Sequence, residues 1–230
     1  MKKLLVLLLT AGIAMTLTCC NGSEPTSVSD KSGNVSGQSS AVKKQTDYLV
    51  LVNRTHPLPK DYENSVTLVK DKNFFGNTFQ IEKQTYEHFK KLREKLMLRE
   101  IQIEVNRAYL TADEQTALIE KYTKDYGKDY AYNYQGNTGY SENQTGLSID
   151  LALYFAGEKI TSDEELIKMS GILREVHAVM AEYGFILRYP EDKVQETDFM
   201  YQPWHIRYVG EKAAKEIYEE EITLEEYLGE

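Results

Sequence analysis

Apolar and polar residues alternate along two stretches of the chain, which predicts a strand in each. Every second residue is apolar from residue 147 to residue 151, and the same alternation runs from residue 204 to residue 208. Successive side chains of a strand point to opposite faces, so the apolar set of each stretch should face a core. Asp150 in the first stretch and His205 in the second therefore belong to the polar faces of two strands.

Elsewhere in the chain, apolar residues recur at the spacing of an α-helix or alternate as in a strand. Apolar residues at 86, 89, 92 and 96 predict an amphipathic helix over residues 85–98. Residues 101–109 alternate as a strand and lead into Thr111 and Glu114, whose spacing fits a capping box for a helix to about Tyr126. Further expected elements are an apolar strand at 48–52 followed by a proline-stiffened segment, a cleft-lining loop at 129–140, a helix from 161 to about 183 that Gly184 ends, a strand at 184–190, a helix from 211 to about 219, and a short turn at 223–228.

Composition restricts the kind of protein. A chain of 230 residues with 41% hydrophobic content can form one packed domain with appendages. The net charge of -9 argues against a nucleic-acid partner, because phosphate binding needs a basic surface. Residues 211–230 hold eight acidic residues and two lysines and so contribute -6 of this charge. We interpret them as the solvated face of a helix.

The first 20 residues have the layout of an export signal. Lys2 and Lys3 precede an apolar run over residues 4–17, which is shorter than the roughly 20 residues that span a bilayer. The run ends in Leu-Thr-Cys-Cys, which resembles a bacterial lipobox, with Cys20 as the expected lipidated residue and Cys19 as the second choice. The alternative is an ordinary signal peptide with incidental cysteines.

The segment that follows the signal is rich in serine and glycine. Residues 21–46 lack hydrophobic periodicity and are expected to form a disordered tether with a span of roughly 28 Å. Three parts are thus expected: a lipoprotein signal peptide at 1–20, the tether at 21–46 and a folded domain at 47–230. The mature protein would then be exported and anchored by lipid on the outer face of the bacterial cytoplasmic membrane.

Two motifs of the folded domain resemble the VanY-type zinc D-alanyl-D-alanine carboxypeptidases. That family has Ser-x-His-x-x-Gly-x-x-x-Asp, followed later by Glu-x-Trp-His or Glu-Pro-Trp-His. Residues 141–150 and 202–205 follow this pattern with two departures, because Asn143 stands in place of the histidine and Gln202 in place of the glutamate. The resemblance implies an α+β fold like that of these peptidases and of the hedgehog domain, in which helices pack against a small antiparallel sheet.

Further matching blocks extend the resemblance over about residues 48–228. They are Leu-Val-Asn-x-x-His-Pro-Leu from residue 51, Tyr-Gly-Phe-Ile-Leu-Arg-Tyr-Pro from residue 183, and a partial match at Arg107 and Tyr109. The resemblance implies these roles: metal ligands at Asn143, Asp150 and His205; catalytic positions at Gln202 and Arg107; and substrate contacts at Arg107, Tyr109, Ser141 and Gln144.

The two departures remove one chemical capability each. A catalytic zinc typically holds three protein ligands and a water whose pKa it lowers, and an amide oxygen is a poorer zinc donor than an imidazole nitrogen. Gln202 cannot exchange a proton near pH 7, so it cannot act as the general base. Glu142 is a poor substitute, because neighbouring side chains of an extended segment point in opposite directions. We therefore expect zinc to bind weakly or not at all.

Two functions follow from these expectations. In the first, the domain is a catalytically impaired relative whose cleft still fits the D-Ala-D-Ala end of a peptidoglycan stem peptide, and it acts by binding. The alternative is an active zinc D,D- or L,D-carboxypeptidase that uses Asn143 as a weak ligand or another group as base.

Overall fold

An antiparallel sheet of five strands forms the centre of the described part of the chain. The computed structural model describes residues 46–230. The strands run in the order β3, β4, β7, β6, and β5 pairs with β4. Their bounds are β3 Gln102–Arg107, β4 Ser148–Phe155, β5 Glu158–Ile160, β6 Phe185–Leu187 and β7 His205–Tyr208, and a separate hairpin consists of β1 Leu68–Lys72 and β2 Thr78–Glu82. This arrangement confirms the α+β class.

The register of this sheet brings three polar motif residues side by side. Asp150 on β4 is paired with Arg107 on β3 and with His205 on β7. The pairing of β3 shifts by one residue between Val105 and Arg107, and such a bulge re-aims the side chains that follow it. Three strands thus present Arg107, Asp150 and His205 next to one another.

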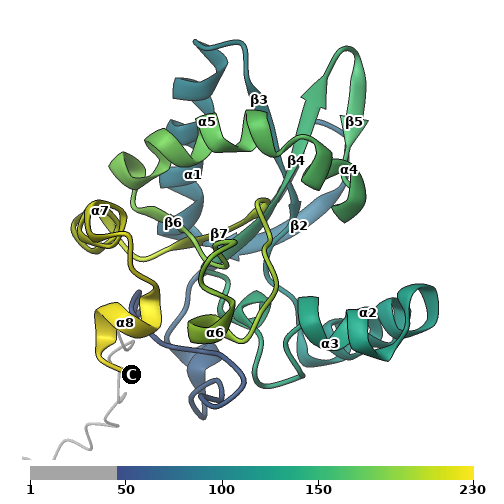
Figure 1. Cartoon of the computed structure of the whole chain (residues 1–230), viewed down its shortest axis with the longest axis vertical. Coiled ribbons are helices and arrows are strands. Elements are labelled where there is room, and N and C mark those ends of the chain that lie inside the picture. The colour runs from purple at the N-terminus through teal and green to yellow at the C-terminus, as the bar shows by residue number, and fades with distance from the viewer. Residues whose placement is uncertain (1–45) are drawn as a thin grey trace, which may run out of the picture. The chain divides into compact units, whose positions relative to one another are not determined.

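The opposite face of the sheet is covered by helices α1 (Lys83–Met97) and α5 (Ser170–Met180). Figure 1 shows these two helices close together, well away from α2 and α3. Their apolar side chains join one hydrophobic cluster with residues of β4 such as Ile149 and Leu151, which are fully buried. The alternating pattern of β4 therefore has the orientation that the sequence predicted, with Asp150 facing away from this core.

Most predicted helices are present. The helix at 85–98 is α1, and Thr111 with Glu114 forms the predicted capping box of α2 (Ala112–Tyr126). The helix expected at 161–183 is divided into three segments and ends where Gly184 adopts a positive φ of 82°. The remaining elements are η1 Tyr62–Asn64, α3 Lys128–Tyr134, η2 Glu142–Thr145, α4 Asp163–Lys168, η3 Ala181–Tyr183, α6 Val194–Thr197, α7 Glu211–Glu220 and α8 Leu224–Leu228.

Three local predictions were wrong or incomplete. The loop expected at 129–140 contains helix α3, in which Tyr130 and Tyr134 stack with ring centroids 4.4 Å apart. The turn expected at 223–228 is the short helix α8, which begins with a capping box. Residues 48–52 form no strand, since residues 48–49 lie in a turn and the carbonyl oxygens of Tyr48 and Val50 accept hydrogen bonds from the Arg207 side chain.

A cluster of buried charges connects distant parts of the chain. The Glu142 carboxylate accepts hydrogen bonds from Arg188 Nε and Arg207 Nη1, both at 2.7 Å. Arg188 also donates two hydrogen bonds to Glu225 of α8, and Asn53 donates one to the same carboxylate. The acidic C-terminal segment is therefore more than a solvated helix face, since Glu225 is 5% exposed.

The predictions for the N-terminal part fall outside the described residues. They are the signal peptide at 1–20, lipid attachment at Cys20 and the tether at 21–46, of which the structure describes only Thr46. Within residues 46–230, no helix is long and apolar enough to cross a membrane.

The buried charge cluster predicts a large effect on stability for Glu225→Ala. This change leaves the fully buried Arg188 with one carboxylate partner in place of two, and breaking a buried ion pair costs about 3–5 kcal/mol. We expect chemical denaturation to show a loss of this size in the free energy of unfolding. The matched control, Glu220→Ala at an exposed position of the same segment, should stay within about 0.5 kcal/mol of wild type. Equal effects of the two changes would contradict the assignment.

Candidate functional site

Arg107, Asp150 and His205 form a continuous chain of contacts across the sheet. Arg107 donates to Asp150 Oδ2 through Nε at 2.7 Å and also through Nη2. The other carboxylate oxygen, Oδ1, lies 2.6 Å from His205 Nδ1. Both oxygens of Asp150 are thus engaged, and the residue is only 3% exposed.

The charge of Asp150 is fixed by these neighbours. Burial on its own raises the pKa of this carboxyl group, but the positive charge of Arg107 and the contact with His205 outweigh burial and lower the pKa to about 2. Asp150 is therefore ionised at neutral pH. In turn, the Asp150 carboxylate outweighs the effect of burial on Arg107 and raises the pKa of its guanidinium group.

The Asn143 amide is held by a glutamine that the sequence analysis missed. Asn143 lies in η2, and Ser141 is the N-cap of this short helix. The Nδ2 of Asn143 donates a hydrogen bond to Gln115 Oε1 at 3.1 Å. Gln115 lies on α2, is fully buried and donates in turn to the carbonyl oxygen of Gly136 at 2.6 Å. A lone glutamine in the first turn of a helix gives no signal of such a role, because the contact spans 28 positions in sequence.

The Gln202 amide is also used as a hydrogen-bond donor. Its Nε2 donates to the carbonyl oxygen of Tyr134, at the end of α3, at 3.3 Å. An ionised glutamate has no proton to donate and could not form this contact. Glu142 offers no replacement base, since its carboxylate is turned toward Arg188 and Arg207 and is 1% exposed. This placement agrees with the prediction that Glu142 is a poor substitute, but the reason differs, because residues 142–145 form the 3-10 helix η2 and not an extended segment.

Five of the predicted site residues surround one small cavity of about 10 Å³. They are Ser141, Asn143, Asp150, Gln202 and His205. Residues 134–136 close one side of this cavity, and Tyr189 and Phe199 close another. A space of this size holds about one water molecule.

The other predicted substrate contacts lie elsewhere. Arg107 borders a separate pocket of about 270 Å³, together with Tyr122, Tyr126 and Asp163. The Gln144 side chain accepts a hydrogen bond from Gly139 N at 2.6 Å. Tyr109 is joined through its backbone N–H to Gln80 at 2.9 Å. Substrate contacts at Gln144 and Tyr109 stay predictions.

The residues at the metal position are a poor fit for a catalytic zinc ion. Within residues 46–230, no three His, Cys, Asp or Glu side chains lie together in a way that could hold a metal ion. Asp150 and His205 are ligands of the right kind, and His205 Nε2 is buried without a hydrogen-bond partner. The third position offers only the amide of Asn143. Its Nδ2 donates a hydrogen bond to Gln115, so its neutral amide oxygen is the only atom left to bind a metal ion. The site therefore supplies two strong zinc ligands.

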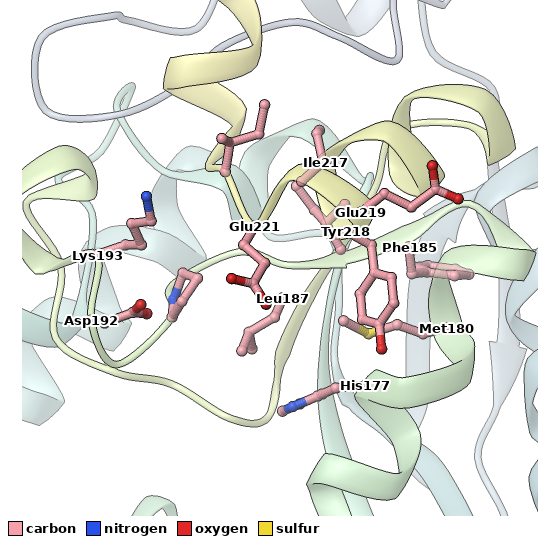
Figure 2. Close-up of a pocket in the computed structure, with 13 residues that line it drawn as sticks. His177, Met180, Phe185, Leu187, Asp192, Lys193, Ile217, Tyr218, Glu219 and Glu221 are labelled. Carbon is pink, nitrogen blue, oxygen red and sulfur yellow. The ribbon is translucent and has the colours of Figure 1, made fainter.

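A further pocket lies apart from the small cavity and shares no lining residue with it. It measures about 550 Å³ and is lined mainly by residues of α5, β6 and α7, such as His177, Leu187 and Tyr218 (Figure 2). No predicted site residue lines it. His177 does support the site indirectly, because its Nε2 donates to the carbonyl oxygen of Pro203 at 2.8 Å. Burial lowers the pKa of His177 to about 4, so this histidine is neutral at pH 7.

Comparison with known proteins agrees with this geometry. Residues 78–211 match the family model of VanY, D-alanyl-D-alanine carboxypeptidase. The bifunctional D-Ala-D-Ala dipeptidase and D-Ala-D-Ala carboxypeptidase VanXYC of Enterococcus gallinarum is 34% identical over 183 residues, which are 78% of this chain and 92% of that protein.

Two solved structures are also similar. One is a variant of the vancomycin resistance D,D-pentapeptidase VanY from the VanB-type cassette, in complex with Zn(II). Its TM-score is 0.67 and its sequence identity is 29%, and the match covers 79% of this chain and 98% of that one. The other is the LD-carboxypeptidase LdcB, whose structure reveals the molecular basis of peptidoglycan recognition, with a TM-score of 0.66, 32% identity, and coverage of 78% and 84%. The family model alone matches more than half of the chain. The chain belongs to the VanY family of D-alanyl-D-alanine carboxypeptidases.

Proposed function

We propose that this domain binds the carboxyl-terminal end of peptidoglycan stem peptides and hydrolyses it slowly or not at all. One observation carries the second half of this proposal. At both positions where the chain departs from the family motif, the side-chain amide donates a hydrogen bond to the protein itself, from Asn143 to Gln115 and from Gln202 to Tyr134. Neither group supplies the imidazole or the base that the chemistry needs.

The binding half rests on the family and on Arg107. Relatives are named for action on D-Ala-D-Ala and for recognition of peptidoglycan. A guanidinium group has five N–H donors, of which Asp150 accepts from Nε and Nη2, and Tyr122 is a further side-chain hydrogen-bond partner. The Arg107 side chain is 19% exposed, so a peptide carboxylate can form a charge-assisted contact with the remaining donors without a metal ion.

The same proposal includes a location. Lipid attachment at Cys20 would place the domain on the outer face of the cytoplasmic membrane, and the tether at 21–46 would let it reach stem peptides of the inner wall. The sequence pattern supports this location through the lipobox-like ending of the apolar run.

The first prediction of the proposed function concerns zinc. Because the site has two strong ligands, the full chain purified without added zinc should contain well under one equivalent, measured by elemental analysis. Loss of a ligand weakens zinc binding steeply, since even a disturbed neighbour of a ligand costs about 10- to 100-fold in affinity. Near-stoichiometric zinc that disappears on Asp150→Ala or His205→Ala would favour the alternative, an active zinc D,D- or L,D-carboxypeptidase.

Peptide binding is the second prediction. Arg107→Lys should weaken binding of a pentapeptide ending in D-Ala-D-Ala roughly tenfold or more in calorimetry, because lysine keeps the charge and loses the forked hydrogen bonds. Lysine also leaves Asp150 with a cationic neighbour, so the fold is less disturbed than by alanine. A pentapeptide amidated at its C-terminus is the control and should bind both proteins weakly. Equal affinity of wild type for the free acid and the amide would refute the role of Arg107.

Restoration of activity is the third prediction. Asn143→His should restore the third zinc ligand, and Gln202→Glu should then restore proton transfer. The double variant with zinc should release D-alanine from a stem pentapeptide at least about 10²-fold faster than wild type, the lower end of an acid–base contribution. Neither single change should reach this rate, because the metal and the base act on the same water.

The restoration experiment also distinguishes the two functions. Wild-type protein that already works at the rate of the double variant would show an ordinary enzyme with an unrecognised ligand set. Glu104, Val105 and Asn106, which precede the matched Arg107, also depart from the family pattern. A double variant that binds zinc and stays inactive would mean that these departures have reshaped the substrate pocket.

A further inference from the structure

The cavity at the candidate site is much smaller than the proposed ligand. Its volume of about 10 Å³ holds a single water molecule. Asn143, Gln202 and His205 are each at most 6% exposed, so a peptide end that contacts them must displace part of the surrounding wall. The identity of this ligand rests on the function proposed above, whereas the burial of these three side chains follows from the structure alone.

The two walls meet along a line of contact that we call the seam. One wall is the end of α3, residues 132–134, and the other is the segment 198–202, which precedes β7. Two hydrogen bonds cross the seam directly. Met200 N donates to the carbonyl oxygen of Asn133 at 3.1 Å, and Gln202 Nε2 donates to that of Tyr134 at 3.3 Å.

Arg54 joins the two walls from a third segment. Its guanidinium group donates through Nη2 to the carbonyl oxygen of Tyr132 on one wall and through Nε to that of Asp198 on the other, at 3.0 Å for the latter. The same group lies over both neighbouring rings, 3.8 Å from the centroid of Tyr132 and 4.2 Å from that of Phe199. Phe199 itself lines the cavity. One side chain thus contacts each wall twice.

The contacts of Arg54 are of a kind that holds backbone segments together. Its hydrogen bonds go to carbonyl oxygens and its faces lie over aromatic rings, while the Asp198 carboxylate adds an electrostatic attraction from one wall. A planar fork of N–H groups can bind two carbonyls while its faces stack on rings, which a lysine cannot do. We propose that Arg54 is a positioning residue that keeps the seam closed over the candidate site, and that opening of the seam admits the peptide.

The single tryptophan of the chain makes the proposal testable. Trp204 is 2% exposed, and its ring lies nearly parallel to that of Tyr134, with centroids 6.4 Å apart. Separation of Tyr134 from the opposite wall should therefore expose Trp204 to a soluble quencher. In the full chain, Arg54→Ala should increase the acrylamide quenching constant of Trp204 fluorescence and accelerate association of the D-Ala-D-Ala pentapeptide. We expect roughly tenfold or more for the association rate, the usual size of one hydrogen bond from a charged group.

Two further variants separate opening from a general loss of stability. Arg54→Lys keeps the charge without the fork and should give an intermediate increase in both measurements. Arg99→Ala removes an arginine that is 42% exposed and remote from the seam in sequence, and it should change neither. A protein that was merely destabilised would bind the peptide less well, whereas an opened seam gives faster binding.

The possible results decide between the two proposals. The role of Arg54 would be overturned if Arg54→Ala and Arg54→Lys left both the acrylamide quenching constant of Trp204 and the association rate of the peptide at their wild-type values. Increased quenching in these variants at an unchanged free energy of unfolding, with no peptide binding by the wild type or the variants, would support the seam and contradict the proposed function. Increased quenching together with faster binding supports both.

Discussion

The structure depends on one buried carboxylate, that of Glu142. It accepts hydrogen bonds from two arginines, Arg188 after β6 and Arg207 on β7, and all three side chains are almost completely buried. A buried charge without partners is very costly, so these groups must meet for the domain to fold. Through Arg207 the network also fixes the N-terminal segment, and through Arg188 it fixes α8. The N-terminal segment and α8 are thereby both linked, through these arginines, to Glu142 in η2.

This convergence explains why the shape of the site can persist while its chemistry changes. Glu142 immediately precedes Asn143, and Arg207 lies two positions after His205, so the network holds the backbone on both sides of the metal position. Sheet pairing supplies the third side chain, because Asp150 is in register with His205. None of these constraints involves the imidazole or the carboxylate that the chain lacks. The scaffold can therefore accommodate amides of similar shape at positions 143 and 202, as the proposed function requires.

The strands and helices whose signal is local, either a periodic pattern of apolar residues or a capping motif, could be predicted from the sequence. The strands that carry Asp150 and His205 followed from alternation, since a slip by one residue would turn every apolar side chain out of the core. The helix that begins at Thr111 followed from its capping box. The apolar segment at 48–52 was mistaken for a strand, because nothing in its local pattern shows that its Tyr48 and Val50 carbonyl oxygens accept from Arg207, 157 positions beyond Val50. The partners of Asn143 and Gln202, which are Gln115 and Tyr134, likewise depend on packing between distant segments and leave no local signal.

The substitution at position 202 has a second consequence beside the loss of a base. A glutamine can donate to the Tyr134 carbonyl across the seam, whereas an ionised glutamate at the same place would set a negative charge against that oxygen. In the proposed function, the glutamine that cannot exchange a proton would therefore also favour closure of the site, as Arg54 would. Restoring a glutamate would change access and chemistry at once. The two effects can be told apart because access alters the rate of peptide association, while general base catalysis alters only the hydrolysis that follows binding.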